Sequence, residues 1–148
     1  MNKALKSRNL VQILIAEANH MNCQLVAGAL RPKRYRVGVL ATAVDANSAL
    51  SVLKERQPDV AIISAQLQDG PLAGFGVLQE LRALHTRTRS IMLLDARKRE
   101  SVVDAFRLGA HGVIFRDEPI ETLVKSIHAV SQGQVWANSL HLGISWKR

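Results

Sequence analysis

Four short apolar runs in this sequence each end on a polar residue, and this pattern limits the possible folds more than any other feature. The runs are ILIAE, VAIIS, IMLLD and VIFR, and they end at Glu17, Ser64, Asp95 and Arg116. Each run is too short for a typical helix but suits a parallel strand that is covered on both faces. If the runs are neighbouring strands, the four polar side chains meet at the carboxyl edge of one sheet, where open α/β folds place their sites.

Segments with helical spacing alternate with these runs. We expect strands at 11–16, 36–42, 59–64 and 90–95, and a short fifth strand within 111–116. We expect helices at 20–31, 45–56, about 75–84 and 101–109, and a fifth helix that starts at Glu118 or Pro119 and ends before Gly133. Asn19 and Asp45 have the side chains of N-caps for the first two helices. The order predicts strands and helices that alternate five times.

Strand–helix alternation with short connections predicts a parallel sheet with right-handed crossovers and helices on both faces. Two topologies have this pattern: a flavodoxin-like (βα)5 doubly wound sheet with strand order 2-1-3-4-5, and half of a dinucleotide-binding fold. The second needs a G-x-G-x-x-G turn after the first strand, but the chain has AEANHM there. We therefore expect the flavodoxin-like fold and no nucleotide cofactor.

The composition indicates one globular domain, because the chain has 148 residues and 47% hydrophobic residues. We divide it into a leader at 1–10, a domain at 11–132 and a tail at 133–148. No apolar stretch approaches the roughly 20 residues of a membrane-spanning helix, and the start lacks the apolar centre of a signal peptide. We therefore expect a cytoplasmic protein without a membrane partner. The single cysteine, Cys23, excludes an internal disulfide, and we expect it to pack inside the fold.

The formal net charge of +8 raises the alternative of a nucleic-acid-binding module. The basic residues are scattered over several turns, however, and no aromatic residues lie between them to stack on bases. No helix-turn-helix, zinc-finger or RNA-binding signature is present. Solvated loops are therefore the favoured interpretation of these basic turns.

Several segments together resemble the receiver domain of bacterial two-component response regulators, in particular those with a LuxR-type DNA-binding domain. The segments are ILIAEANHMNCQLVAGAL, QPDVAII with the following loop and GVLQELR, FRLGAHGVIFRDEPIETLVKSIHAV, and GQVWANS. The resemblance covers about residues 11–138. It implies a domain in which an aspartate at the end of the third strand accepts a phosphoryl group from a histidine kinase, with the assistance of Mg²⁺.

The resemblance also implies the positions of the site. The family has an acidic pair after the first strand, a hydroxyl after the fourth and a lysine after the fifth, and these hold Mg²⁺ and the phosphoryl oxygens. The matching residues here are Glu17 and Ala18 for the acidic pair, Ser64 for the phosphoacceptor, Asp95 for the hydroxyl and Arg116 for the lysine. Val113 stands where many receivers have an aromatic residue that turns inward on phosphorylation. The β-branched side chain of valine has one preferred rotamer and cannot make a comparable movement.

These residues predict a degenerate phosphorylation pocket. Ser64 cannot form an acyl phosphate, Ala18 removes a metal ligand, and Asp95 would repel the phosphoryl oxygens. We expect the Mg²⁺ site to be lost. We also expect Arg116 to reach Asp95, and Glu17 beyond it, in a partly buried ion pair. Two other aspartates are poor acceptors, because Asp59 begins its strand at the opposite edge and Asp69 is expected to form a turn in Asp-Gly-Pro.

The resulting function hypothesis is a receiver that regulates by protein–protein interaction without phosphorylation, and is not an enzyme. The expected partners are an output domain, a histidine kinase or another regulator, and a second copy of the chain, with DNA reached only through a further domain that the tail would lead to. A flavodoxin-like hydrolase that uses Ser64 is the enzymatic alternative. It would need a nearby base and an oxyanion hole, and no G-x-S-x-G elbow surrounds Ser64.

Overall fold

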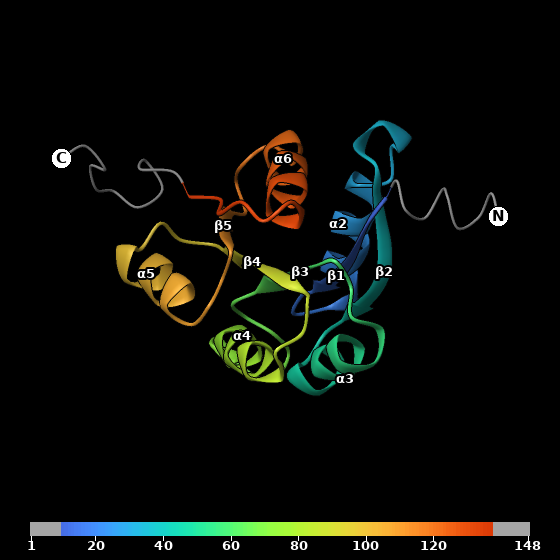
Figure 1. Ribbon diagram of the computed structural model, residues 1–148. Helices are drawn as coiled ribbons and strands as arrows, with labels where there is room; N and C mark the ends of the chain where they lie inside the picture. The colour runs from blue at the N-terminus through green and yellow to red at the C-terminus, as the bar shows by residue number, and fades with distance from the viewer. Residues whose placement is uncertain (1–9, 138–148) are drawn as a thin grey trace.

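The computed structural model describes residues 10–137, which form a five-stranded parallel sheet with helices on both faces (Figure 1). The strand order is β2-β1-β3-β4-β5, so the predicted flavodoxin-like topology is confirmed. The strands are β1 (Val11–Ala16), β2 (Val37–Ala43), β3 (Val60–Ser64), β4 (Arg89–Leu94) and β5 (Gly112–Phe115). Every residue of β3 is buried, as expected for a central strand that is covered on both faces.

Five α-helices connect and cover the strands. They are α2 (His20–Ala29), α3 (Ala46–Arg56), α4 (Ala73–Leu84), α5 (Arg99–Arg107) and α6 (Ile120–Ser131). Helices α2 and α6 lie on one face of the sheet, and α3, α4 and α5 lie on the other (Figure 1). Alternate residues of β1 divide between the two layers, since Ile13 and Ile15 pack with α2 and α6 while Leu14 packs with α3 and α4. A doubly wound core therefore supports both faces of the sheet.

The local signals that the sequence gives for helix ends are mostly confirmed. The Asn19 side chain accepts a hydrogen bond from the Asn22 backbone N–H at 2.8 Å, and Asp45 accepts one from the Ser48 N–H at 2.8 Å. The backbone amide contact lowers the pKa of Asp45 from its ordinary value. Gly109 follows α5 with a φ of 109°, a left-handed conformation that favours glycine.

Helix α2 differs from the expectation. It ends at Ala29 rather than Arg31, and two of its apolar residues, Met21 and Leu25, are 70% and 65% exposed. Cys23 is buried, as expected, and so is Leu30, and burial raises the pKa of the Cys23 thiol. The helix thus forms where the spacing predicts it, but Met21 and Leu25 face solvent. A 3₁₀ turn, η1 (Lys33–Tyr35), follows and was not predicted.

The segment after α6 continues along the edge of the sheet. Trp136 forms a parallel bridge with Gly112, in which its N–H donates to the His111 carbonyl at 2.9 Å. The Trp136 side chain also packs against the core below α2 and α6. The predicted tail at 133–148 thus begins with residues that are paired with β5. The rest of that tail, and residues 1–9 of the predicted leader, lie outside the described residues. No helix between residues 10 and 137 has the length and apolarity to span a membrane.

Candidate functional site

The four polar residues that follow or end the apolar runs come together at the carboxyl edge of the sheet. Ser64 is the last residue of β3, and Glu17, Asp95 and Arg116 come directly after β1, β4 and β5. The pairing of β1, β3, β4 and β5 in one sheet places these strand ends side by side. The location of the site therefore follows from the topology.

Arg116 contacts the other three side chains at once. Its Nη1 donates to Glu17 Oε2 at 2.7 Å, and its Nη2 donates to Glu17 Oε1 at 3.2 Å, so the carboxylate is held by the two prongs of the guanidinium. Nη2 also donates to the Ser64 hydroxyl at 2.9 Å, and Nε donates to Asp95 Oδ1 at 2.5 Å. One guanidinium therefore fills the space between the ends of four strands.

The buried members of this cluster are Glu17 and Ser64, and Glu17 is its buried charge. The Glu17 side chain is 1% exposed, whereas the Arg116 side chain is 36% exposed and the Asp95 side chain is 63% exposed. Arg116 reaches both carboxylates as expected, but the pair with Asp95 is exposed and the partly buried pair is the one with Glu17. Burial acts to lower the pKa of Arg116, but hydrogen bonds and charge attraction from Glu17 and Asp95 outweigh it and raise this pKa.

A second basic residue, Arg97, lies in the loop that follows β4. Arg97 pairs with Asp117 at 2.7 Å and lies over the Phe115 ring, with 4.7 Å between the guanidinium carbon and the ring centroid. The same aspartate holds the pKa of Arg97 above its ordinary value. No pattern in the sequence predicted this pair. The placement of both residues in loops that follow strands is the one signal that could have located it.

The backbone of α4 approaches Ser64 closely at Gly74. The Gly74 N–H donates to the Ala65 carbonyl at 2.8 Å, and a Cβ atom at Gly74 would lie 1.9 Å from the Ser64 carbonyl oxygen. This contact fixes the start of α4 against the end of β3. Gly74 could not be selected from the sequence, since one glycine among several gives no signal of a close backbone approach.

The other two aspartates that were considered as acceptors lie elsewhere. Asp59 is at the opposite edge, where it accepts from the Gln12 backbone N–H at 2.8 Å and pairs with Arg87 at 3.3 Å. Asp69 lies in the loop after β3, and both of its carboxylate oxygens accept from the Ala46 backbone N–H at 3.3 Å. Asp69 thus contacts the start of α3 in addition to preceding the Gly-Pro turn. Neither residue takes the place of Ser64 in the cluster.

Comparison with known proteins decides the family. Residues 13–128 match the model of the response regulator receiver domain. This chain belongs to that family. The receiver is 27% identical over 97 residues to a nitrate/nitrite response regulator protein homolog of Haemophilus influenzae, which amounts to 66% of this chain and 46% of the relative. The receiver thus spans about half the length of the curated relatives it matches.

Solved structures agree on the fold. A LuxR-family two-component response regulator from Aurantimonas superposes with a TM-score of 0.81 at 18% identity, and the match covers 90% of this receiver and 96% of that chain. The signal receiver domain of NarL from Mycobacterium tuberculosis gives a TM-score of 0.78 at 23% identity, with 85% and 99% covered. At these identities the likeness establishes the fold alone.

The site residues of this receiver do not fit Mg²⁺. A hard divalent cation needs several oxygen ligands in a near-octahedral arrangement. Both Glu17 oxygens are bonded to Arg116, the next residue is Ala18, and the guanidinium brings positive charge to the same place. Between residues 10 and 137, no three His, Cys, Asp or Glu side chains gather closely enough to hold a metal ion.

Titration calorimetry with MgCl₂ is expected to show no saturable heat in the millimolar range, because a Mg²⁺ ion would have to displace Arg116 from Glu17. A receiver with a complete acidic pair and aspartate acceptor serves as the positive control. Saturable Mg²⁺ binding that disappears in Glu17→Gln would contradict this prediction.

The expected switch position is in the core. Val113 is 1% exposed, and its neighbours on the α5 side of the sheet include Met92, Ala105 and Phe115. The Val113 N–H donates to the Trp136 carbonyl at 3.2 Å, so β5 is hydrogen-bonded on the edge that faces away from β4 as well. That Val113 does not change its rotamer as a signalling switch stays a prediction.

Proposed function

We propose that this chain is an atypical receiver domain of a NarL/LuxR-type response regulator, which regulates an output domain or partner by protein–protein interaction without aspartyl phosphorylation. One observation carries the proposal: the Arg116 guanidinium is bonded to Glu17, Ser64 and Asp95 at the same time. The NarL/LuxR assignment rests on the relatives and similar structures described above. An output domain, a histidine kinase or another regulator, and a second copy of the chain are the proposed partners.

The chemistry of the cluster supports loss of phosphorylation. Ser64 offers a neutral hydroxyl that cannot form an acyl phosphate, and its side-chain partner within residues 10–137 is Arg116, which donates a hydrogen bond and cannot act as a base. The same contact argues against a hydrolase that uses Ser64. Asp95 places a carboxylate where a phosphoryl group would need a donor. The positive charge that would stabilise a phosphoryl group is already paired with carboxylates.

An apolar groove beside the pocket supports the interaction part of the proposal. It has a volume of about 300 Å³, lies between α2 and α6, and reaches from Ala29 to Arg116. Leu25, which is 65% exposed, lines it, and Met21 of the same helix is 70% exposed. Exposed apolar side chains around a concave surface are typical of protein interaction sites.

Incubation with acetyl phosphate and Mg²⁺ is expected to add no mass to the protein, because the acceptor carboxylate and one metal ligand are missing. Intact-mass spectrometry measures the result directly. A receiver that carries the aspartate acceptor is treated in the same tube, and its single phosphoryl adduct shows that the donor is active. A phosphoryl adduct on this chain, mapped to Ser64 or to any carboxylate of the pocket, would overturn the proposal.

A further inference from the structure

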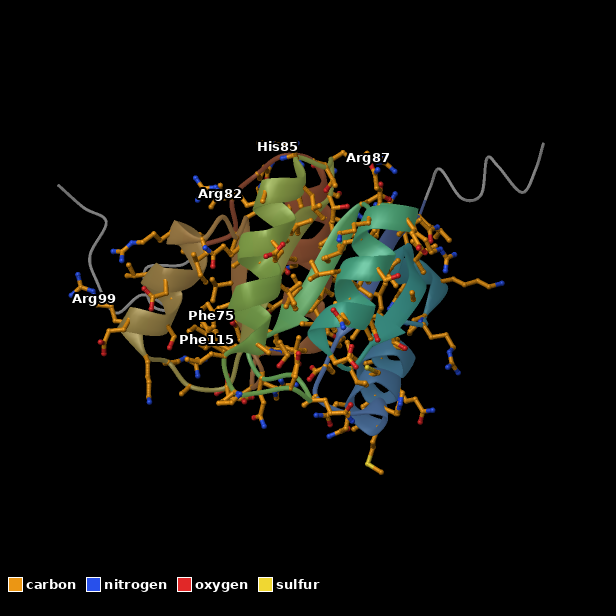
Figure 2. All side chains as sticks on the ribbon, turned by 90° about the horizontal axis from the view of Figure 1, so that it is seen from below. Phe75, Arg82, His85, Arg87, Arg99 and Phe115 are labelled. Carbon is orange, nitrogen blue, oxygen red and sulfur yellow. The ribbon has the colours of Figure 1, made fainter. Side chains whose placement is uncertain are left out.

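Basic residues that are scattered along the sequence gather at the amino edge of the sheet. Each helix runs back from the carboxyl edge, so its last turn and the following loop lie at the amino edge. Figure 2 shows Arg82, His85 and Arg87 together at one end of the molecule, away from Phe75 and Phe115. The lysines and arginines in these segments are Arg31, Lys33, Arg34, Arg36, Lys54, Arg56, Arg82, Arg87, Arg89 and Arg107, and the acidic residues are Glu55, Asp59 and Asp104.

Two concave surfaces lie side by side at this edge, on either side of the loop between α4 and β4. The first has a volume of about 500 Å³, and its lining includes Arg36, Arg87, Arg89 and His128. The second has a volume of about 410 Å³ and is lined by residues that include Arg82, His85, Thr86, Arg107 and His111. We call the two together the amino-edge groove. Its cationic groups come from four loops or helix ends that are far apart in the sequence.

The positive charge of the groove is only partly balanced within the described residues. Asp59 is bonded to Arg87 and to the Gln12 backbone N–H, and Asp104 is 3.9 Å from Arg107. Neither Arg36 nor Arg89 forms an ion pair with any residue in 10–137. Burial and the charge of Arg89 lower the pKa of His111, in keeping with a positive surrounding. Arg36 and Arg89 therefore remain available for an external anion.

The shape and composition of the groove favour an extended polyanion over a protein. Arg36 precedes β2 and Arg89 begins β4, three strand spacings apart, which is roughly 14 Å at 4.7–4.9 Å per strand. None of the five exposed large apolar side chains in 10–137 lines the groove, whereas protein interfaces need an apolar centre. Protein–DNA interfaces are polar and strongly positive instead.

We propose that the amino-edge groove binds the phosphate backbone of duplex DNA without reading sequence. The planar guanidinium group of arginine can donate two hydrogen bonds to the oxygens of a phosphate. No Phe, Tyr or Trp lies in the four basic loops with an exposed ring: Tyr35 is 8% exposed, and Phe106 is half-buried against the core. Single strands are bound mainly by stacking on aromatic rings, so the duplex fits better. This contact is separate from the pocket at Arg116 and belongs to the receiver itself.

Fluorescence anisotropy with a labelled 20-base-pair DNA duplex of mixed sequence tests the proposal on the 148-residue chain. We expect saturable binding in low salt, and a plot of log K against log [NaCl] with a slope of about −4, as for roughly four phosphate contacts. The double variant Arg36→Gln/Arg89→Gln should weaken binding roughly tenfold or more and make the slope shallower by about 2. Melting temperatures and circular dichroism show that the variant is folded.

A matched control removes the same charge at the other end of the molecule. Lys98→Gln/Arg99→Gln changes two exposed residues at the start of α5, and should leave affinity and slope unchanged. Equal weakening by both double variants, or absence of binding, would overturn the proposal. Displacement of the duplex by poly-L-glutamate at equal charge concentration would also overturn the proposal, because it would indicate an acidic protein partner. Binding to phosphatidylglycerol vesicles without binding to the duplex would overturn it as well, because it would indicate a membrane surface.

Discussion

Arg116→Ala is expected to lower the free energy of unfolding by about 3 kcal/mol or more. The substitution removes both hydrogen bonds to Glu17, whose side chain is 1% exposed, and leaves a buried carboxylate without its charged partner. The lost contact with Asp95 adds little, since that side chain is 63% exposed and screened by water. Urea denaturation followed by circular dichroism measures the change, with the m-value checked for two-state behaviour.

Two further variants separate the contributions to the Arg116 effect. Asp95→Asn removes only the exposed pair and should cost less than about 1 kcal/mol. Arg116→Lys keeps the charge but loses the two-pronged geometry, so its cost should fall between the other two. An unfolding midpoint that is the same in Arg116→Ala and the unsubstituted protein would show that the ion pair does not stabilise the fold.

Gly74→Ala is expected to destabilise the protein by about 3 kcal/mol or more. The new methyl group would lie 1.9 Å from the Ser64 carbonyl oxygen and 2.9 Å from the Ala65 Cα. These are backbone atoms, so no side-chain rotation can relieve the overlap, and α4 must move away from β3. The hydrogen bond from the Gly74 N–H to the Ala65 carbonyl would lengthen with that movement. The same denaturation experiment gives the cost.

Gly76 offers a matched control in the same helix. It is exposed, and a Cβ at this position would meet nothing within 4 Å. Gly76→Ala should therefore be neutral or stabilising by up to about 1 kcal/mol, because alanine favours helix. Similar stability changes in Gly74→Ala and Gly76→Ala would mean that the close approach of α4 to Ser64 is not important for the fold.

The sheet could be predicted from the sequence because four of its five strands are short apolar runs that end on, or are followed directly by, a polar residue. The runs at 11–16 and 59–64 are covered on both faces, so nearly every residue in them is apolar, and the signal does not depend on which face a side chain takes. The N-caps Asn19 and Asp45 are equally local. Parallel pairing then brings Glu17, Ser64, Asp95 and Arg116 to one edge, which is why the sequence alone indicates these residues as neighbours.

Features that depend on packing between distant elements could not be predicted in the same way. In α2, Met21 and Leu25 have the spacing of a buried stripe, but the helix turns Cys23 toward β1 and β2. The order of burial in the pocket, with Glu17 inside and Asp95 outside, depends on how far each strand extends beyond its neighbour. The gathering of basic turns at the amino edge likewise appears only when the helices are placed on the sheet.

The shared guanidinium also limits the order in which this pocket could change over generations. Arg116 balances two carboxylates, which leaves one negative charge in excess. A first change of Ser64 to aspartate would add a third carboxylate to the same cation, and a first change of Arg116 to lysine would keep the charge beside the buried Glu17 but lose the two-pronged contact. Either of these first steps is thus expected to give a less stable protein. The shared contacts of Arg116 therefore favour the retention of Ser64 and Arg116 together once both are present.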